Sequence, residues 1–410
     1  MFFISKRATG KISALAGASL TGIVIAAGTA YAAPRDVADR LCNRINGVPP
    51  TAELLTSVTQ LVEAGKFKEA AAACINVPQG YFFNETLKSL FLKWQSPDES
   101  NRSALSDFTT TLIGFVKDDI PFDTVLSADI VYVSNLPNTP PYSLAKTLTA
   151  GNQPPAPDMY ATLAASPAPL HNSIVRAAQT TAAGALALPA DAISGVMTTR
   201  EFAASYYSAG TNRRGLASVL HNFLCSDLEV IHDPTRSDMR VRRDVTRSPG
   251  GDSSLYKNRC AGCHAGMDAL AGAYAFYDWD DTTTPNAPRL VFTPNTVRTK
   301  LNRNASEFPE GFVTTDSSWI NMWAEGPSAK KLGWKGANTG SGLKSLGEAL
   351  GKTDAFARCM AQHAVETMCL RKAVSQADLD AVDTLATSFK TGNYNLKNTF
   401  IDAAVYCTKD

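Results

Sequence analysis

Residues 260–264 read Cys-Ala-Gly-Cys-His, a C-x-x-C-H motif. Two cysteines at this spacing can form thioether bonds to the vinyl groups of a haem, and the histidine that follows can bind the iron. A chain with a covalent haem must fold around that flat group. The motif therefore predicts haem c held by Cys260 and Cys263, with His264 as the proximal iron ligand.

Three other interpretations of this motif compete with haem c. A thioredoxin-like dithiol normally follows a strand in a βαβ unit, and no such pattern flanks the motif. Half of a zinc site would need a second C-x-x-C pair, which the sequence lacks. A simple disulfide between Cys260 and Cys263 is the last alternative, and the adjacent histidine together with the export signal described next favours haem c.

The first 32 residues read as a secretory signal peptide. Lys6, Arg7 and Lys11 precede an apolar stretch at 13–28, and Ala30-Tyr31-Ala32 forms an A-x-A cleavage box. A membrane anchor is the alternative, but the apolar stretch is shorter than the ~20 residues that a spanning helix needs. We expect a mature chain that begins at Ala33, lies in the periplasm and has no integral membrane segment.

The charge balance excludes one class of partner. The chain has 39 basic and 38 acidic residues, and the signal peptide accounts for three of the basic ones. The mature chain is therefore slightly acidic, which excludes a strongly basic nucleic-acid binder. The roughly 378 remaining residues suffice for two domains or for one large domain.

The six cysteines outside the motif form an even set, which favours disulfides in an exported protein. Cys42 and Cys74 lie in adjacent predicted helices. Cys369 and Cys407 end the first and third of three antiparallel C-terminal helices, so they lie at the same end. Cys359 is about 15 Å from Cys369 along one helix, too far to bridge. We therefore predict the pairs Cys42–Cys74, Cys369–Cys407 and, by elimination, Cys225–Cys359.

The apolar pattern predicts a mainly α, multi-helical fold with long irregular loops and a C-terminal three-helix segment. Residues 128–133 alternate like a strand but lack a partner, so they are interpreted as extended chain or a helix end. Proline is concentrated near 135–170. The predicted parts are a signal peptide at 1–32, a helical domain at 33–135, a Pro-rich linker at 136–195 and a haem-binding domain at 196–410.

The distal iron ligand is not fixed by the motif. Met267 is too close to His264 to pass around the porphyrin edge, since three extended residues span only ~10 Å. Met322 lies well downstream in a Gly- and Asn-rich stretch, and it is the predicted distal ligand. The alternatives left open are a five-coordinate iron or one of the following: His221, His232, Met239 and His363.

Arginines are concentrated just before the motif, between 236 and 259. They can neutralise haem propionates, dock an acidic partner, or simply form a solvated loop. Tyr256 lies one turn before Cys260 and packs either on the haem edge or in the core.

The run from Cys260 to Asp278 resembles the C-x-x-C-H-x-x-M-D signature of planctomycete-type cytochrome c-like exported proteins of unknown function. The resemblance covers roughly residues 195–407, and 35–135 more loosely, and Ala269 replaces the usual proline after Met-Asp. It implies helical modules around a haem c and supplies no substrate.

The sequence thus predicts a periplasmic monohaem c-type cytochrome that transfers electrons to or from an exported redox protein. Two alternatives stay open: a peroxidase-like haem oxidoreductase with an open distal site, and a structural or assembly protein.

Overall fold

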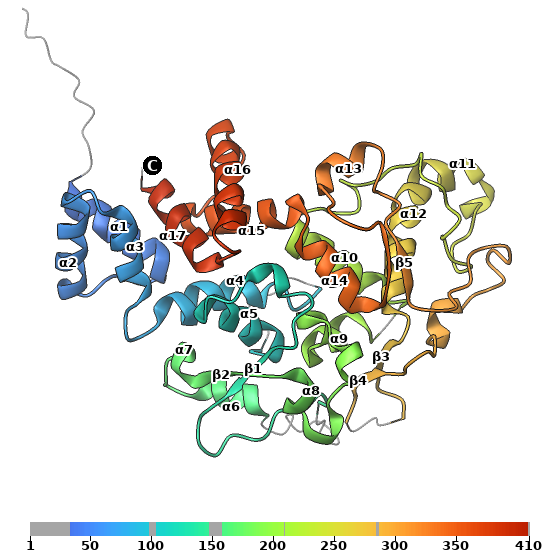
Figure 1. Ribbon diagram of the computed structural model, residues 1–410, viewed down its shortest axis with the longest axis horizontal. Coiled ribbons are helices and arrows are strands. Elements are labelled where there is room, and N and C mark those ends of the chain that lie inside the picture. Colours follow the sequence, from blue (N-terminus) through green and yellow to red (C-terminus); the bar gives the residue numbers. More distant parts are fainter. Residues whose placement is uncertain (1–32, 98–103, 147–157, 209, 284–286, 409–410) are drawn as a thin grey trace, which may run out of the picture. The chain divides into compact units, whose positions relative to one another are not determined.

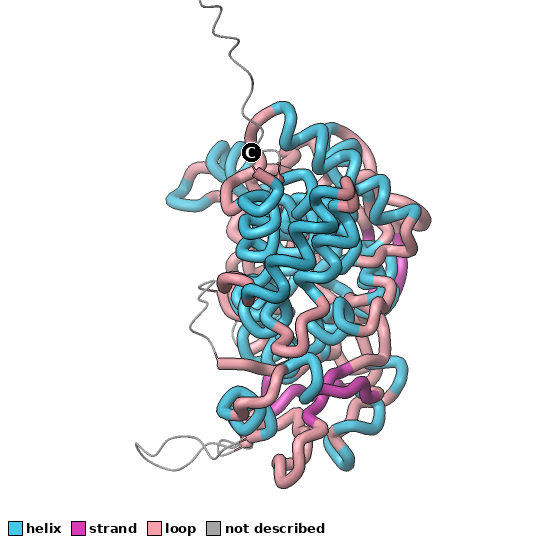
Figure 2. The backbone as a smooth tube through the Cα atoms, turned by 90° about the vertical axis from the view of Figure 1, so that its left-hand side faces the viewer, coloured by secondary structure: helices cyan, strands magenta, loops and turns pink. Residues whose placement is uncertain are grey.

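The computed structural model describes residues 33–97, 104–146, 158–208, 210–283 and 287–408 (Figure 1). The predicted signal peptide at 1–32 lies outside the described residues. Pro34–Asp410 form one compact unit, and the predicted domain boundaries at 135/136 and 195/196 fall inside it. Most of the described chain is helical, which confirms the mainly α fold (Figure 2). None of the described helices is both long and apolar enough to cross a membrane.

The N-terminal part begins with three helices that each bury one side, and it ends with a helix, α5 (Asp107–Lys117), that is buried on nearly all sides. Thr51 caps the second helix, because its hydroxyl accepts a hydrogen bond from the Leu54 amide at 3.3 Å. Leu55, Val58 and Val62 then recur at helical spacing and are buried. The helices are α1 (Pro34–Asn46), α2 (Ala52–Glu63), α3 (Phe67–Ile75), α4 (Lys88–Leu92) and α5 (Asp107–Lys117).

The middle part contains one strand pair that the sequence did not predict. Val131–Ser134 (β1) pairs antiparallel with Ile174–Ala177 (β2). The interpretation of 128–133 as unpaired extended chain or a helix end is therefore wrong, because the partner strand lies inside the segment predicted as a Pro-rich linker. The helices of this part are α6 (Met159–Ala165), α7 (Leu170–Ser173), α8 (Gln179–Ala182) and α9 (Arg200–Tyr206).

The following part combines helices with two antiparallel strand pairs, β3 with β4 and β5 with β6. Its elements are α10 (Arg213–Leu224), α11 (Ser253–Leu255), α12 (Ala261–Leu270), β3 (Tyr277–Asp280), β4 (Arg289–Phe292), β5 (Ser318–Ile320), α13 (Pro327–Leu332), β6 (Thr339–Ser341) and α14 (Gly342–Gly351).

The C-terminal helices are α15 (Asp354–Cys369), α16 (Gln376–Thr391) and α17 (Leu396–Cys407). α15 packs against both of the others, and α17 also contacts α3 from the opposite end of the chain (Figure 1). The three predicted disulfides are confirmed, with Cα–Cα distances of 5.2, 5.2 and 5.1 Å for Cys42–Cys74, Cys225–Cys359 and Cys369–Cys407. Such disulfides are typical of an exported protein or an oxidising compartment.

Candidate functional site

The helical segment that carries the C-x-x-C-H motif begins at a capped turn. The Asp252 carboxylate accepts a hydrogen bond from the Ser254 amide at 2.8 Å, which satisfies a donor at the start of α11. α11 continues through a π-helical stretch, Tyr256–Cys260, into α12. Cys260 and Cys263 have free thiols and are half-buried, whereas the other six cysteines are disulfide-bonded.

Two glycines fix the orientation of α12. Gly262 and Gly266 lie about half a turn around the helix from His264. A Cβ atom at Gly262 would lie 2.6 Å from the ring of His232, and one at Gly266 would overlap the ring of Trp323. Because only glycine permits this approach, the helix is pressed against the protein on its glycine side. Cys260 and His264 lie on the other side.

His264 is oriented by a carboxylate one turn later on the same helix. Its Nδ1 atom lies 3.3 Å from Oδ1 of Asp268. The Asp268 side chain is fully buried, whereas that of His264 is 24% exposed. This contact engages Nδ1, so Nε2 is the nitrogen left to bind a metal or a substrate.

Asp268 belongs to a buried network of charges. Arg213 donates to both of its oxygens, from Nε at 2.5 Å and from Nη2 at 2.8 Å. The Arg242 amide donates to Oδ2 at 3.0 Å. Burial works against ionisation, but the hydrogen bonds from His264 and Arg213 outweigh it and hold the pKa of Asp268 far below its ordinary value. Asp268 is therefore a carboxylate at neutral pH.

The two arginines of this network differ in how well they are paired. Arg213 also makes a bidentate ion pair with Asp244, at 2.6 and 2.8 Å. Arg242 is almost fully buried and donates from Nη1 to the Thr211 carbonyl at 3.0 Å. Among the described residues, its Nε and Nη2 atoms have no partner. Burial lowers the pKa of Arg242 to about 10, so the guanidinium is still charged at neutral pH.

Arg240 and Arg247, in the loop before the motif, pack on aromatic rings. The Arg240 guanidinium lies 4.5 Å from the ring centre of Phe312, and that of Arg247 lies 4.3 Å from Phe308 and 4.8 Å from Tyr256. Tyr256 is buried and donates its hydroxyl proton to Asp238 at 2.7 Å. These arginines hold the loop in place.

Two large apolar side chains are exposed on the segments beside the motif. Met239 is 63% exposed and follows Asp238, the acceptor of the Tyr256 hydroxyl. Leu255, next to Tyr256, is 45% exposed.

The predicted distal ligands lie at several places. Met322 is half-buried next to Trp323, the residue whose ring contacts Gly266. His232 contacts Gly262, so it also lies on the glycine side of α12. His221 lies on α10, where its Nδ1 is 2.5 Å from Asp227. The motif side chains and Asp268 are thus brought together by one helix, and the distal ligand stays a prediction.

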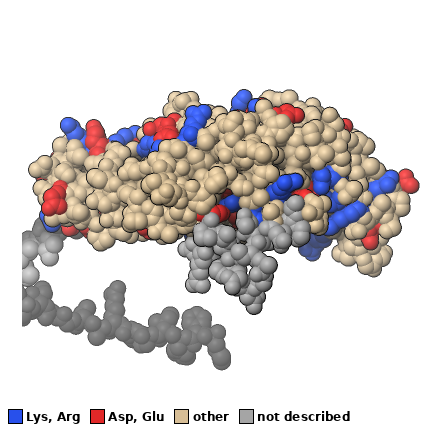
Figure 3. Space-filling view, turned by 90° about the horizontal axis from the view of Figure 1, so that it is seen from below, with Lys and Arg blue, Asp and Glu red and all other residues tan. Residues whose placement is uncertain are grey.

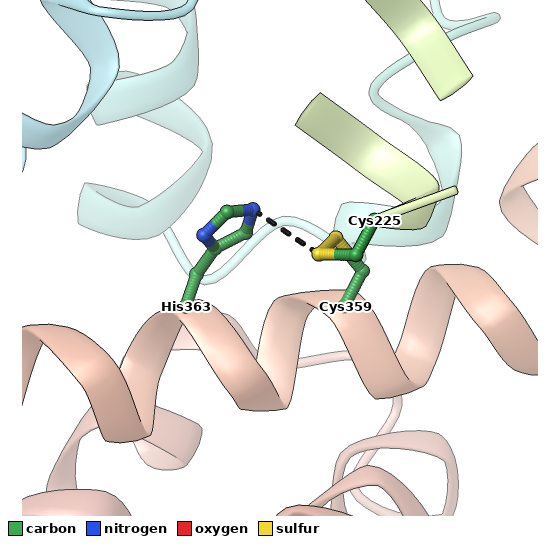
Figure 4. Close-up of side chains that lie close together, drawn as sticks. All are labelled: Cys225, Cys359 and His363. Atoms are coloured by element: carbon green, nitrogen blue, oxygen red, sulfur yellow. Dashed lines mark hydrogen bonds between the residues drawn. A yellow bond between two sulfur atoms is a disulfide. The ribbon is translucent and has the colours of Figure 1, made fainter. Parts of the chain in front are cut away.

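His363 belongs to a second cluster, with the disulfide Cys225–Cys359 (Figure 4). Its Nε2 lies 3.6 Å from Sγ of Cys225 and 3.1 Å from the Asn222 carbonyl. Burial lowers the pKa of His363 to about 4, so the imidazole is neutral. Because both sulfurs are bonded to each other, they are not thiolate ligands, and His363 is a half-buried residue that forms a hydrogen bond with the Asn222 carbonyl.

Two grooves meet at His221 and Asn222, near the end of α10. One of about 880 Å³ is lined by Trp94, His363 and His221, and one of about 310 Å³ is lined by His221, Arg214 and Leu228. The Cys263 thiol donates to the Leu228 carbonyl at 3.4 Å. Leu228 therefore connects the two features: it lines the smaller groove and contacts Cys263 of the motif.

Asp268 is the site residue that sequence reasoning did not single out. The signal was present, because a carboxylate four residues after a histidine lies on the same side of a helix. No family model, curated protein or solved structure matches this chain. The functional interpretation therefore depends on the geometry of the site.

Proposed function

We propose that the protein is a periplasmic monohaem c-type cytochrome that transfers electrons to or from an exported redox partner. One observation carries the proposal: the cysteines that stay outside disulfides are the two of the C-x-x-C-H motif. In an oxidising compartment, a pair of cysteines held as thiols beside a histidine suits covalent attachment of haem c.

The residues at the site fit this cofactor. Cys260 and Cys263 would hold the haem through thioethers, and His264 would bind the iron through Nε2, since Nδ1 faces Asp268. The unpaired N–H groups of Arg242 beside Asp268 are suitable donors for a propionate. When bound, haem c would supply one-electron chemistry. The resemblance to planctomycete-type cytochrome c-like proteins is part of the same proposal.

The distribution of charged side chains on the surface is compatible with a charged protein partner. Charges of both signs are interspersed on the face shown in Figure 3, with Lys and Arg gathered toward its right-hand side. Such a group steers an acidic protein toward the molecule and sets the salt dependence of association. An exported acidic redox protein is therefore the proposed partner, and neither nucleic acid nor a membrane span is part of the proposal.

The test is export of the full chain with a haem c maturation system, followed by denaturing electrophoresis with haem staining and a pyridine haemochrome spectrum. We expect covalent haem with two thioethers in the wild type and a spectrum with one remaining vinyl group in Cys260→Ala. The control is the pair Cys42→Ser with Cys74→Ser, which removes a disulfide and keeps the motif. A wild-type protein without covalent haem would refute the proposal and support a structural or assembly role.

A haem-dependent, peroxidase-like oxidoreductase is the second candidate. The buried carboxylate at Nδ1 of His264 favours it, because a histidine with an anionic partner is a stronger electron donor to the iron. The distal ligand separates the two candidates. Loss of the methionine-to-iron absorption band in Met322→Ala would identify Met322 as the ligand and support electron transfer. A wild-type spectrum without that band, together with rapid reaction with peroxide, would support the enzyme.

A further inference from the structure

We propose that Asp268 is a positioning residue that fixes the ring of His264 and, through it, shifts the reduction equilibrium of the bound haem toward the oxidised form. This inference rests on the proposed function, because it concerns the same cofactor.

The first step of the argument is that Asp268 cannot turn away from His264. Its Oδ1 atom accepts from Arg213 Nε and faces His264 Nδ1, and its Oδ2 atom accepts from Arg213 Nη2 and from the Arg242 amide. Both oxygens are therefore held by partners on α10 and on the loop before α11. A fixed acceptor of this kind selects the tautomer of the histidine with its proton on Nδ1, and it sets the direction in which Nε2 points.

The second step concerns the charge that His264 meets. A carboxylate that accepts a hydrogen bond from Nδ1–H gives the imidazole partial anionic character, and a more basic ligand stabilises the higher oxidation state of the metal. The two cations beside Asp268 reduce this effect. However, Arg213 is also paired with Asp244, so its charge is shared between two carboxylates. Because Asp268 is fully buried, solvent screens its contact with His264 only weakly.

A merely structural role for Asp268 makes a different prediction. In that case Asp268 would hold α12 to α10 through Arg213, and its loss would lower stability without changing the properties of the haem. Asp244 provides the comparison, because it binds the same guanidinium and has no contact with His264 among those that the described residues show. Asp278, which pairs with Arg298 at 3.0 Å and Lys300 at 2.5 Å, provides a control in a separate ion-pair cluster.

The experiment measures two properties of the purified haem protein and of its Asp268→Asn, Asp244→Asn and Asp278→Asn variants. The first is the midpoint potential, from a spectroelectrochemical titration. The second is the iron–histidine stretching band in resonance Raman spectra of the reduced protein just after photolysis of its carbon monoxide adduct, which leaves the iron five-coordinate. We expect Asp268→Asn to favour reduction at least tenfold, which is 59 mV for a one-electron couple, and to lower the frequency of the band. Asp244→Asn should have a much smaller effect, and Asp278→Asn none.

The outcomes separate this inference from the proposed function. A wild type without covalent haem would refute the proposed function. A haem-loaded Asp268→Asn variant with the wild-type potential and band, or an Asp244→Asn variant with an equal shift, would overturn the inference and leave the function standing. If Asp268→Asn does not fold, Asp268→Glu keeps the charge and moves the carboxylate relative to Nδ1. An unchanged band in Asp268→Glu would also overturn the inference.

Discussion

Gly266→Ala tests whether the close approach of Trp323 positions α12. The new Cβ atom would overlap the Trp323 ring, which is fully buried. Overpacking of this kind costs about 3 kcal/mol at the upper end of its usual range. Alanine in place of glycine in a helix interior returns about 1 kcal/mol. We therefore expect a net loss of about 2 kcal/mol in the free energy of unfolding, measured by urea denaturation followed by circular dichroism.

A second substitution makes the test specific to this contact. Trp323→Phe replaces the large ring with a smaller one and costs about 2 kcal/mol by itself. If Trp323 is the group that the added methyl of Gly266→Ala would strike, the double variant should be more stable than the sum of the two losses by about 1–2 kcal/mol. Gly266→Ala at wild-type stability, or strict additivity in the double variant, would refute the reasoning about how α12 is held.

Two further predictions concern the rest of the core. His363 is half-buried at the edge of a groove, and desolvation lowers its pKa from 6.5 to about 4. As the pH falls, the unfolded chain therefore binds a proton at this residue before the folded chain does. Stability should therefore fall by about 3 kcal/mol between pH 6.5 and 4, and most of that fall should be absent in His363→Gln; equal pH profiles would contradict this. The Cys225–Cys359 disulfide closes a separation of 134 residues and Cys42–Cys74 one of 32. Replacing the first pair by serines should lower the free energy of unfolding by about 5 kcal/mol, and replacing the second pair should lower it by about 4 kcal/mol. Urea denaturation measures both losses. A larger loss for the second pair would show that loop length does not control the difference.

The parts of the structure that were predicted correctly depend on local spacing. Helical periodicity and the Thr51 cap define α2, and the ends of α15 and α17 place Cys369 beside Cys407. The β1–β2 pair was missed because its partners come from segments about 40 residues apart, and four-residue strands carry little signal alone. The packing of Trp323 on Gly266 could not be predicted from the sequence for the same reason. It joins a loop to a helix across more than 50 residues.

The charge network under His264 is more readily explained by a role at the motif than by a role in stability. Asp268 and Arg242 are buried and the Arg213 side chain is only 16% exposed, so the cluster takes charges largely out of water. Such clusters are often no more stabilising than apolar residues of the same volume. Leaving N–H groups of Arg242 unpaired adds a further cost. The ion pair between Arg213 and Asp268 is sufficient to join α10 to α12, and that role does not require the further contact of Asp268 with His264. The contact of Asp268 with Nδ1 of His264 is the one in this network that bears on metal binding, because it leaves Nε2 as the nitrogen available to a metal.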